Sequence, residues 1–359
     1  MSDPADYFAW ADETFRLDRV FAKPEPLRGV RVLELAILYL GPVTAALLAE
    51  FGAEVIKVEL PGAGDPIRSI TPQARYWKNA GLAWLNEARN KYHLAIDVRK
   101  PEGTALLKAL ATKSDVIIEN FRAGTMEAKW GIGYRQLGEL NPRLIYVANT
   151  GFGQWGPYSQ GRASYDAIAQ SVSGIAAITG FPERKPLKSG AWIGDYFGAL
   201  MSAVAILAAL HWRDRTGQGQ LIDLAQSESL IRAMDWTWVH HGLTRKSRAR
   251  SGNRDTAISP SGIFRCRDGM VAIAAPSDEA FRGLSQAMSR PELASDGRFA
   301  THLDRLKEEN ARTLFAIIAA WATEKGKAEV DALGNQYGFA AAPVVNSQDH
   351  YEDPHLRAR

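Results

Sequence analysis

Apolar runs and amphipathic stretches alternate along the first half of the chain. Short runs that are apolar at most positions are typical of strands buried on both faces of a sheet. They lie at 31–38, 53–60, 94–98, 115–120 and 143–153. Between them, residues 43–51 and 102–113 carry apolar side chains at helical spacing. Strands that alternate with helices in this way predict an α/β fold, with a parallel sheet covered on both faces.

The pattern changes after the last of these strands. Two helices are expected at 164–177 and 196–214, and a turn with a short strand within 216–225. The next polar stretch, at 245–262, is rich in Arg, Ser and Gly, which is typical of a long loop or a domain junction.

The last third of the chain begins with a predicted β-hairpin over 262–275, which turns at Asp268-Gly269. Helices follow at 278–288, 301–324 and 326–335. We therefore expect a large α/β domain at 1–225, then a linker and a smaller α+β domain at 226–345.

Composition and charge narrow the possible functions. A chain of 359 residues is longer than one ordinary domain, so two domains are expected. The net charge of +3 suits an anionic small molecule as ligand better than a nucleic acid. The one cysteine, Cys266, excludes a disulfide framework and fits a reducing compartment. The N-terminus lacks the pattern of a signal peptide. The apolar stretch 197–210 is shorter than the roughly 20 residues that cross a bilayer, so we expect a buried helix and a cytoplasmic protein.

The usual catalytic motifs are missing. The glycine loops at 41–42, 61–65 and 150–156 match neither dinucleotide nor P-loop fingerprints. The histidines form no H-E-x-x-H or H-x-H pattern, so no metal site is expected. No G-x-S-x-G elbow occurs, and Cys266 has no evident base beside it, which disfavours serine and cysteine hydrolases.

Two carboxylates remain as candidates for the chemistry. Asp195 follows a small-residue loop and precedes an apolar helix. An aspartate in that position is typical of a helix N-cap, but the same geometry suits a carboxylate nucleophile that faces a cleft. Asp166 lies in a helical pattern next to Tyr165. Physical reasoning from the residues alone leaves these interpretations open.

Seven segments share their order and spacing with a known enzyme family. They are LRGVRVLELA at 27–36, GAEVIKVE at 52–59, DVIIENF at 115–121, NPRLIYVANTGFGQWGP at 141–157, SYDAIAQSVSG at 164–174, GDYFGAL at 194–200 and RTGQGQLIDLA at 215–225. Read together, they resemble the class III CoA-transferases, the CaiB/BaiF family of formyl-CoA and carnitine CoA-transferases. The resemblance implies a Rossmann-like large domain, an interlocked homodimer, and transfer of CoA from an acyl-CoA to a free carboxylic acid. It also implies that 346–359 begins a segment returning to the large domain, cut short in this chain.

The resemblance implies catalytic roles as well. In this family the nucleophile is the aspartate of the segment that matches GDY, which is Asp195. Its carboxylate attacks the donor thioester to form a mixed anhydride, and CoA then forms an aspartyl-CoA thioester that the acceptor acid resolves. Asp166 matches an acidic position close to the catalytic aspartate. Tyr39 stands where formyl-CoA transferase has a glutamine that closes over the intermediate. This chemistry needs no metal and no tightly bound cofactor.

Positions carried over from the family also predict how CoA, as a substrate, is bound. The expected contacts are Leu38, Leu40, Gly41, Ile96, Asn120 and Phe121, with Lys129 at the adenine end and Arg68 and Lys91 as further polar positions.

The departures from formyl-CoA transferase concern the acyl group. SGNRDTAISPSG at 251–262 replaces its tetraglycine loop, so formyl-CoA is not the expected donor. Trp192, Tyr196 and Phe197 flank the nucleophile and favour a larger acid, dicarboxylic or aromatic. The same aromatic residues are equally typical of a packed core.

Other functions compete with CoA transfer. α-Methylacyl-CoA racemases share the fold, but carry a histidine where this chain has Tyr165, whose phenol is a poor base at neutral pH. An intramolecular CoA shift would use the same aspartate and stays open. A catalytically silent partner subunit is disfavoured because Asp195 is retained. A dinucleotide-dependent dehydrogenase is disfavoured because no glycine fingerprint follows the first strand.

Overall fold

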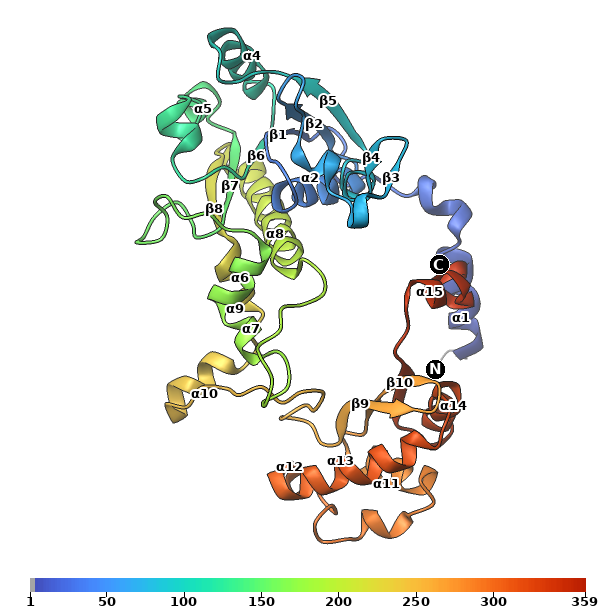
Figure 1. The fold of residues 1–359 in the computed structure, drawn as a ribbon. Helices are drawn as coiled ribbons and strands as arrows, with labels where there is room; N and C mark the ends of the chain where they lie inside the picture. The colour runs from blue at the N-terminus through green and yellow to red at the C-terminus, as the bar shows by residue number, and fades with distance from the viewer. Residues whose placement is uncertain (1–3) are drawn as a thin grey trace. The chain divides into compact units, whose positions relative to one another are not determined.

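Six parallel strands organise the larger of two units in the computed structural model, which describes residues 4–359 (Figure 1). In spatial order they are β5 (Lys91–Ala95), β2 (Glu54–Glu59), β1 (Arg31–Glu34), β6 (Val116–Glu119), β7 (Ile145–Thr150) and β8 (Gln220–Ala225). Every neighbouring pair is parallel, which confirms the predicted α/β fold. The order reverses between β1 and β6, and such sheets bind ligands where the strands on either side of the reversal end.

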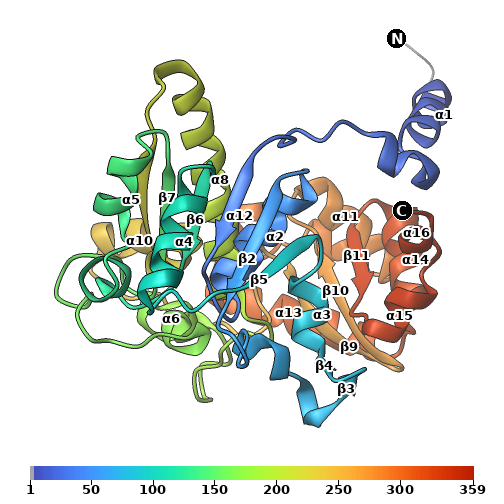
Figure 2. The ribbon, with the colours of Figure 1, turned by 90° about the horizontal axis from the view of Figure 1, so that it is seen from above.

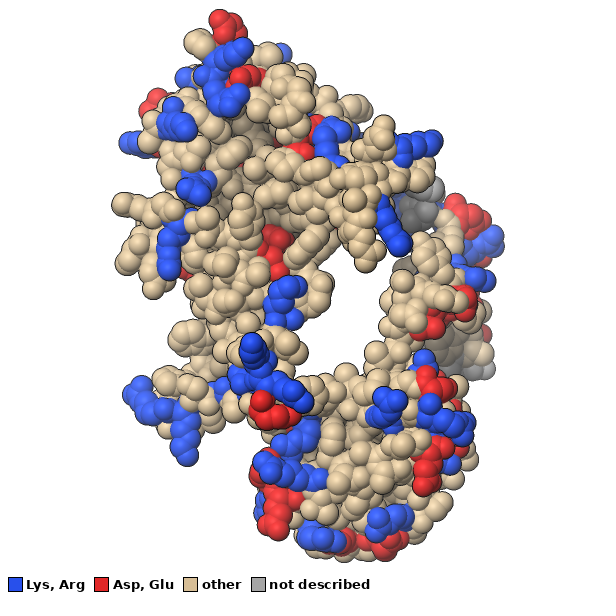
Figure 3. Space-filling model, viewed as in Figure 1, with Lys and Arg blue, Asp and Glu red and all other residues tan. Residues whose placement is uncertain are grey.

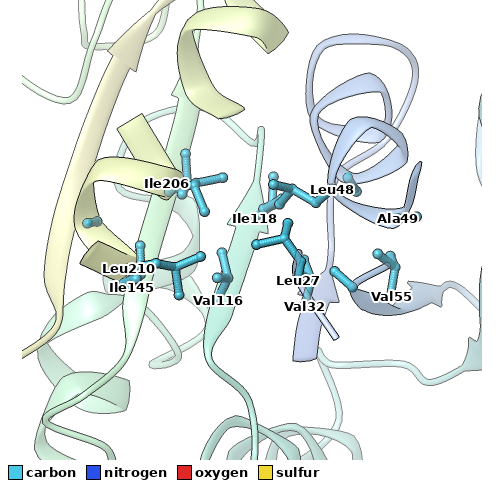
Figure 4. Close-up of a cluster of buried hydrophobic side chains, with 14 of the residues drawn as sticks. Leu27, Val32, Leu48, Ala49, Val55, Val116, Ile118, Ile145, Ile206 and Leu210 are labelled. Atoms are coloured by element: carbon cyan, nitrogen blue, oxygen red, sulfur yellow. The ribbon is translucent and has the colours of Figure 1, made fainter. Parts of the chain in front are cut away.

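Helices cover both faces of this sheet because its strands are apolar on both sides (Figure 2). On one face, α2 (Leu40–Glu50) and α8 (Ile193–Thr216) pack over the strands, and Figure 4 shows side chains of both helices beside those of the strands. On the other face lie α4 (Pro101–Ala111) and α5 (Tyr134–Leu140). Consecutive residues of one strand therefore belong to different cores, as Val32 and Leu33 of β1 do.

The shorter elements of the larger unit surround this sheet. They are β3 (Tyr76–Trp77), β4 (Ala80–Gly81), α3 (Leu82–Glu87), α6 (Asp166–Ser173), α7 (Ile175–Ile178), α9 (Gln226–Arg232), α10 (Thr237–Thr244), and the single turns η2 (Pro66–Ser69), η3 (Pro72–Ala74) and η4 (Thr125–Lys129). The helix expected over 164–177 is divided, because Gly174 adopts a left-handed conformation with φ 93° and ends α6.

The smaller unit is an α+β structure around an antiparallel sheet. Its strands lie in the order β11 (Ala340–Pro343), β10 (Gly269–Ala274) and β9 (Ser261–Cys266). The hairpin was predicted and β11 was not. Its helices are α1 (Pro4–Thr14), α11 (Asp278–Ala287), α12 (His302–Leu306), α13 (Glu308–Thr323), α14 (Lys327–Tyr337), α15 (Ser347–Glu352) and α16 (Pro354–Ala358), with turns η1 (Leu17–Ala22) and η5 (Pro291–Ala294). The helix expected over 301–324 is two helices, because Lys307 has an extended backbone.

The two units divide the chain differently from the predicted domains. The larger unit comprises 24–179 and 186–248, so it includes a segment assigned to the linker. The smaller unit comprises 180–185, 249–359 and the described residues before Pro24. The segment expected to return to the large domain, 346–359, therefore groups with the smaller unit.

One helix has more exposed apolar surface than its sequence led us to expect. In α8, Leu200, Val204 and Leu207 are 51%, 61% and 40% exposed. By length and composition alone, α8 is the one helix among residues 4–359 that could cross a membrane. However, 44% of its apolar window is buried inside the chain, and core helices meet the same test.

Charged side chains of both signs are interspersed over the face of the chain seen in Figure 3.

Candidate active site

Asp195 lies in the first turn of α8, where the positive end of the helix dipole favours an anion. The side-chain amide of Gln226 donates a hydrogen bond to its Oδ1 at 2.6 Å. Burial, together with the charge of nearby Asp166, raises the pKa of Asp195 to about 7. A carboxylate with few partners and a raised pKa is typical of a functional group rather than a structural one.

Asp166 performs the capping role that the sequence left open for Asp195. Its Oδ1 accepts a hydrogen bond from the backbone N–H of Gly194 at 2.8 Å, at the start of α8. Its Oδ2 accepts one from the side chain of Gln170 at 2.6 Å. Asp166 thereby satisfies a helix N–H that has no partner within the helix. Asp195 does not cap the helix and remains available for chemistry.

Both aspartates face a cavity of about 430 Å³, which we call the Asp195 cavity. It is built by the loops that follow β1, β6 and β7 and by the starts of α8 and α9, at the ends of neighbouring parallel strands. Predicted residues that line it are Leu38, Tyr39, Leu40, Asn120, Phe121, Asp166 and Asp195. The rings of Tyr39 and Trp192 pack together in its wall, with centroids 4.2 Å apart. The structure thus brings the three predicted catalytic residues into one site.

The loop that carries Tyr39 has an unusual backbone. Leu38 adopts φ 65°, a left-handed conformation that costs a non-glycine residue free energy. Its backbone N–H donates to Oδ1 of Asp65 at 2.9 Å. Asn120 bonds the backbone of Ile37 twice, accepting from N–H at 2.8 Å and donating to the carbonyl at 2.6 Å. The loop is therefore held by a residue that follows β2, Asp65, and by a residue that follows β6, Asn120.

Four buried ionic side chains, which we call the buried charge cluster, lie beneath the same loop. They are Glu34, Lys57, Asp65 and Lys91. The Lys57 ammonium contacts Glu34 at 2.6 Å and Asp65 at 2.7 Å, and the Lys91 ammonium contacts Glu34 at 2.9 Å. Both lysines also donate to loop carbonyls, Lys57 to Ala36 and Lys91 to the residue after Gly41. The cluster therefore supports the loop and is closed to ligands.

A second cavity adjoins the first. This Ile96 cavity has a volume of about 320 Å³ and is lined mainly by apolar side chains, with Ile96 and Trp130 among them. Ile37 and Phe121 line both cavities, so they form the wall between them. Two of the predicted CoA contacts, Ile96 and Phe121, thus lie beside a pocket suited to a flat apolar group.

Four predicted CoA contacts line none of these cavities. Lys91 is fully buried in its ion pair, and Arg68 is paired with Glu59 at 2.6 Å and stacked over a tryptophan ring. Lys129 is exposed at the end of η4. Gly41 has a packing role, because a Cβ there would lie 2.1 Å from Cβ of Ala36. The roles of these four residues toward CoA therefore stay predictions.

Gln226 and Arg162 are among the polar residues of the Asp195 cavity that escaped prediction. Gln226 is the first residue after β8, and the end of a parallel strand is the place where ligand-binding side chains gather, which is the signal that could have found it. Arg162 lies in a loop without periodicity and gives no such signal. Tyr165 lines the cavity as well, and no histidine does among the described residues.

The chain thus combines an α/β fold, a cavity where the order of its parallel sheet reverses, and a partly buried carboxylate at a helix start. Residues 27–359 match the model of CoA-transferase family III. The chain belongs to this family and is a CoA-transferase, which confirms the resemblance seen in its sequence.

Named relatives and a solved structure agree with this assignment. The chain is 43% identical to a succinyl-CoA–D-citramalate CoA-transferase of Chloroflexus aurantiacus, over 94% of this chain and 82% of the relative. It is 38% identical to a succinyl-CoA:mesaconate CoA-transferase of Haloarcula hispanica, over 93% and 84%. The crystal structure of a CaiB/BaiF family protein from Brucella suis superposes with a TM-score of 0.83 at 35% identity, over 94% and 88%.

Proposed function

We propose that this enzyme moves CoA between two short dicarboxylic acids, with Asp195 as the covalent nucleophile. The observation that carries the proposal is the environment of Asp195: a cavity position, one hydrogen bond from Gln226 and a pKa raised to about 7. Succinate, citramalate and mesaconate, the acids in the names of the two relatives, are all dicarboxylic. A succinyl-CoA-like donor and a related acceptor acid are therefore the expected substrates.

In the first half of the reaction, the Asp195 carboxylate attacks the carbonyl carbon of the donor thioester. Because Gln226 donates to Oδ1, Oδ2 is the oxygen that attacks. The C–S bond breaks, CoA leaves as a thiolate, and an anhydride joins Asp195 to the acyl group. The thiolate then attacks the Asp195 carbonyl carbon, which releases the donor acid as a carboxylate and leaves an aspartyl-CoA thioester.

The second half reverses these steps with the acceptor. Its carboxylate attacks the aspartyl thioester and expels the thiolate, which then attacks the acceptor carbonyl and frees Asp195. Both covalent intermediates are prone to hydrolysis, so the site must limit the access of water. The packed rings of Tyr39 and Trp192 beside Asp195 suit that role. The amide of Gln226 keeps the aspartyl carbonyl oriented between steps.

CoA in this proposal extends from the Ile96 cavity to the Asp195 cavity. Ile96, Phe121 and Trp130 would surround its adenine ring in the Ile96 cavity. Asn120 and the loop at 38–40 would lie along its path to Asp195 in the Asp195 cavity. Phe121 borders both cavities, so a single extended ligand can occupy them together.

A homodimer is also part of the proposal. The exposed apolar side chains of α8, Leu200, Val204 and Leu207, form a surface that a second copy of the chain would bury. Sedimentation equilibrium tests this, and a monomer at micromolar concentration would contradict it.

The nucleophile is tested by intact-protein mass spectrometry after incubation with succinyl-CoA. The wild-type protein should gain a CoA-sized adduct that hydroxylamine removes, and Asp195→Ala should gain none. Transfer of CoA to citramalate or mesaconate should fall by at least about 10³-fold in Asp195→Ala. An adduct of equal yield on Asp195→Ala would place the nucleophile elsewhere. Absence of an adduct together with exchange of the α-proton of a branched acyl-CoA would favour racemisation.

A further inference from the structure

Arg162 is a cation of the Asp195 cavity that has no carboxylate partner. Its guanidinium carbon lies 4.0 Å from the ring centroid of Tyr158 and 5.3 Å from that of Phe152. No ion pair or hydrogen bond engages its guanidinium among residues 4–359. Stacking on aromatic rings holds a guanidinium in place while its N–H donors stay free. Arg162 is thus positioned and unpaired at the wall of a substrate cavity.

The place of Arg162 in this wall distinguishes it from the other cavity arginine, Arg122. Arg122 follows Phe121, which separates the Asp195 cavity from the Ile96 cavity and so marks the proposed CoA side. Arg162 stacks on Phe152 and Tyr158, which border a third cavity of about 490 Å³ around Trp155. The two arginines therefore mark different sides of the Asp195 cavity, and Arg162 is on the side away from the Ile96 cavity.

Arg162 is close in sequence to Ser164, which hydrogen bonds connect to the nucleophile through Gln226. It precedes Ser164 by two residues, a span of at most about 7 Å between Cα atoms. The Ser164 hydroxyl donates to Oε1 of Gln226 at 3.2 Å, and Gln226 donates to Asp195 at 2.6 Å. Because Asp195 and the exposed Arg162 line the same cavity, a short acyl chain attached at Asp195 can direct its far end toward Arg162.

We propose that Arg162 binds the distal carboxylate of the acyl group and so selects short dicarboxylic acids over monocarboxylic acids of equal length. This inference rests on the proposed function. A guanidinium pairs with a carboxylate through two parallel hydrogen bonds, which gives both affinity and orientation. A monocarboxylic acid of the same length would place a methyl group against the unpaired guanidinium, which adds neither affinity nor orientation. Because both acids of the reaction occupy the same side of Asp195 in turn, one arginine selects donor and acceptor alike.

The test compares succinyl-CoA with butyryl-CoA, which share CoA and chain length and differ in the distal carboxylate. The rate of aspartyl-CoA formation is measured for each donor by rapid quench and intact-protein mass spectrometry. Arg162→Met should lower the succinyl-CoA rate by about 10- to 100-fold and change the butyryl-CoA rate by less than about threefold. Arg162→Lys, which keeps the charge but not the paired donors, should recover part of the loss. Arg143→Met, which removes an exposed arginine before β7, is the matched control.

Each other outcome overturns the inference. An equal fall with both donors would mean that Arg162 contacts CoA, and no fall with either donor would mean that it binds no substrate. If the rate with succinyl-CoA alone falls in Arg122→Met and not in Arg162→Met, then Arg122 binds the distal carboxylate instead. Failure of the wild-type protein to form an adduct with any acyl-CoA would instead contradict the proposed function.

Discussion

The buried charge cluster and the Asp195 cavity are two charged regions of the same unit with opposite arrangements. In the cluster, Lys57 and Lys91 contact carboxylates at 2.6 to 2.9 Å, and all four side chains are buried. In the cavity, Asp195 has one hydrogen-bond partner and Arg162 has no anionic partner within residues 4–359. The loop at 36–42 rests on the first region and extends into the second.

The difference between these two regions shows how a charged residue with a structural role can be distinguished from one with a role in catalysis or binding. Burial alone does not make a charge functional, because paired buried ions mainly specify structure. An unpaired charge that lines a cavity, such as the exposed Arg162, has no such structural explanation. By this measure the paired Lys91, which the family resemblance placed near CoA, has the surroundings of a structural charge, and the unpaired Arg162 has those of the proposed substrate contact.

The largest expected effect is on stability, in the buried charge cluster. Glu34→Gln removes the anion shared by Lys57 and Lys91, and breaking a buried pair costs about 3–5 kcal/mol of unfolding free energy. Asp195→Asn is the matched substitution in the cavity. It should leave stability unchanged or higher, because the raised pKa of Asp195 shows that the folded state disfavours its charge. Urea denaturation measures both, and equal losses in the two variants would contradict the distinction.

The next effect is on the chemical step, through Gln226. Gln226→Leu removes the hydrogen bond to Asp195, and loss of one positioned donor lowers kcat by about 10²-fold. KM for both acids should change little, and the acidic limb of the pH profile should move to higher pH because the carboxylate anion loses its donor. Ser164→Ala, which affects only the far side of the Gln226 amide, is the control and should cost about fivefold or less. A loss confined to KM would show that Gln226 binds substrate instead.

The fold could be predicted well because its signals are local. The consecutive apolar residues 116–118 predict a strand that is buried on both faces, and β6 is buried at all its positions. The errors arose where one residue's backbone decides the outcome, as at Gly174 in α6 and at Lys307 between α12 and α13. A prediction from the spacing of apolar residues depends on many positions at once, so it extends a helix through a single residue whose backbone ends it.

The site was predictable only where a motif or a strand end marks a residue. Asp195 and Tyr39 lie in segments with recognisable neighbours, so the resemblance located them. Arg68 and Lys91 have the right charge at matching positions, but Arg68 pairs with Glu59 at the end of β2, and Lys91 of β5 pairs with Glu34 of β1. Sequence gives the charge of a side chain, whereas its availability depends on long-range pairing.

The smallest expected effect is on the pH profile, through Asp166. A protonated Asp195 cannot attack, so with a pKa of about 7 the rate of adduct formation should rise about tenfold per pH unit up to that value and then level off. Asp166→Asn keeps an acceptor for the Gly194 N–H but removes a negative charge that raises the pKa of Asp195. The acidic limb should therefore shift to lower pH, with the plateau rate retained. An unchanged limb would mean that burial alone sets the pKa, and a lost plateau would mean that Asp166 acts in the chemistry itself.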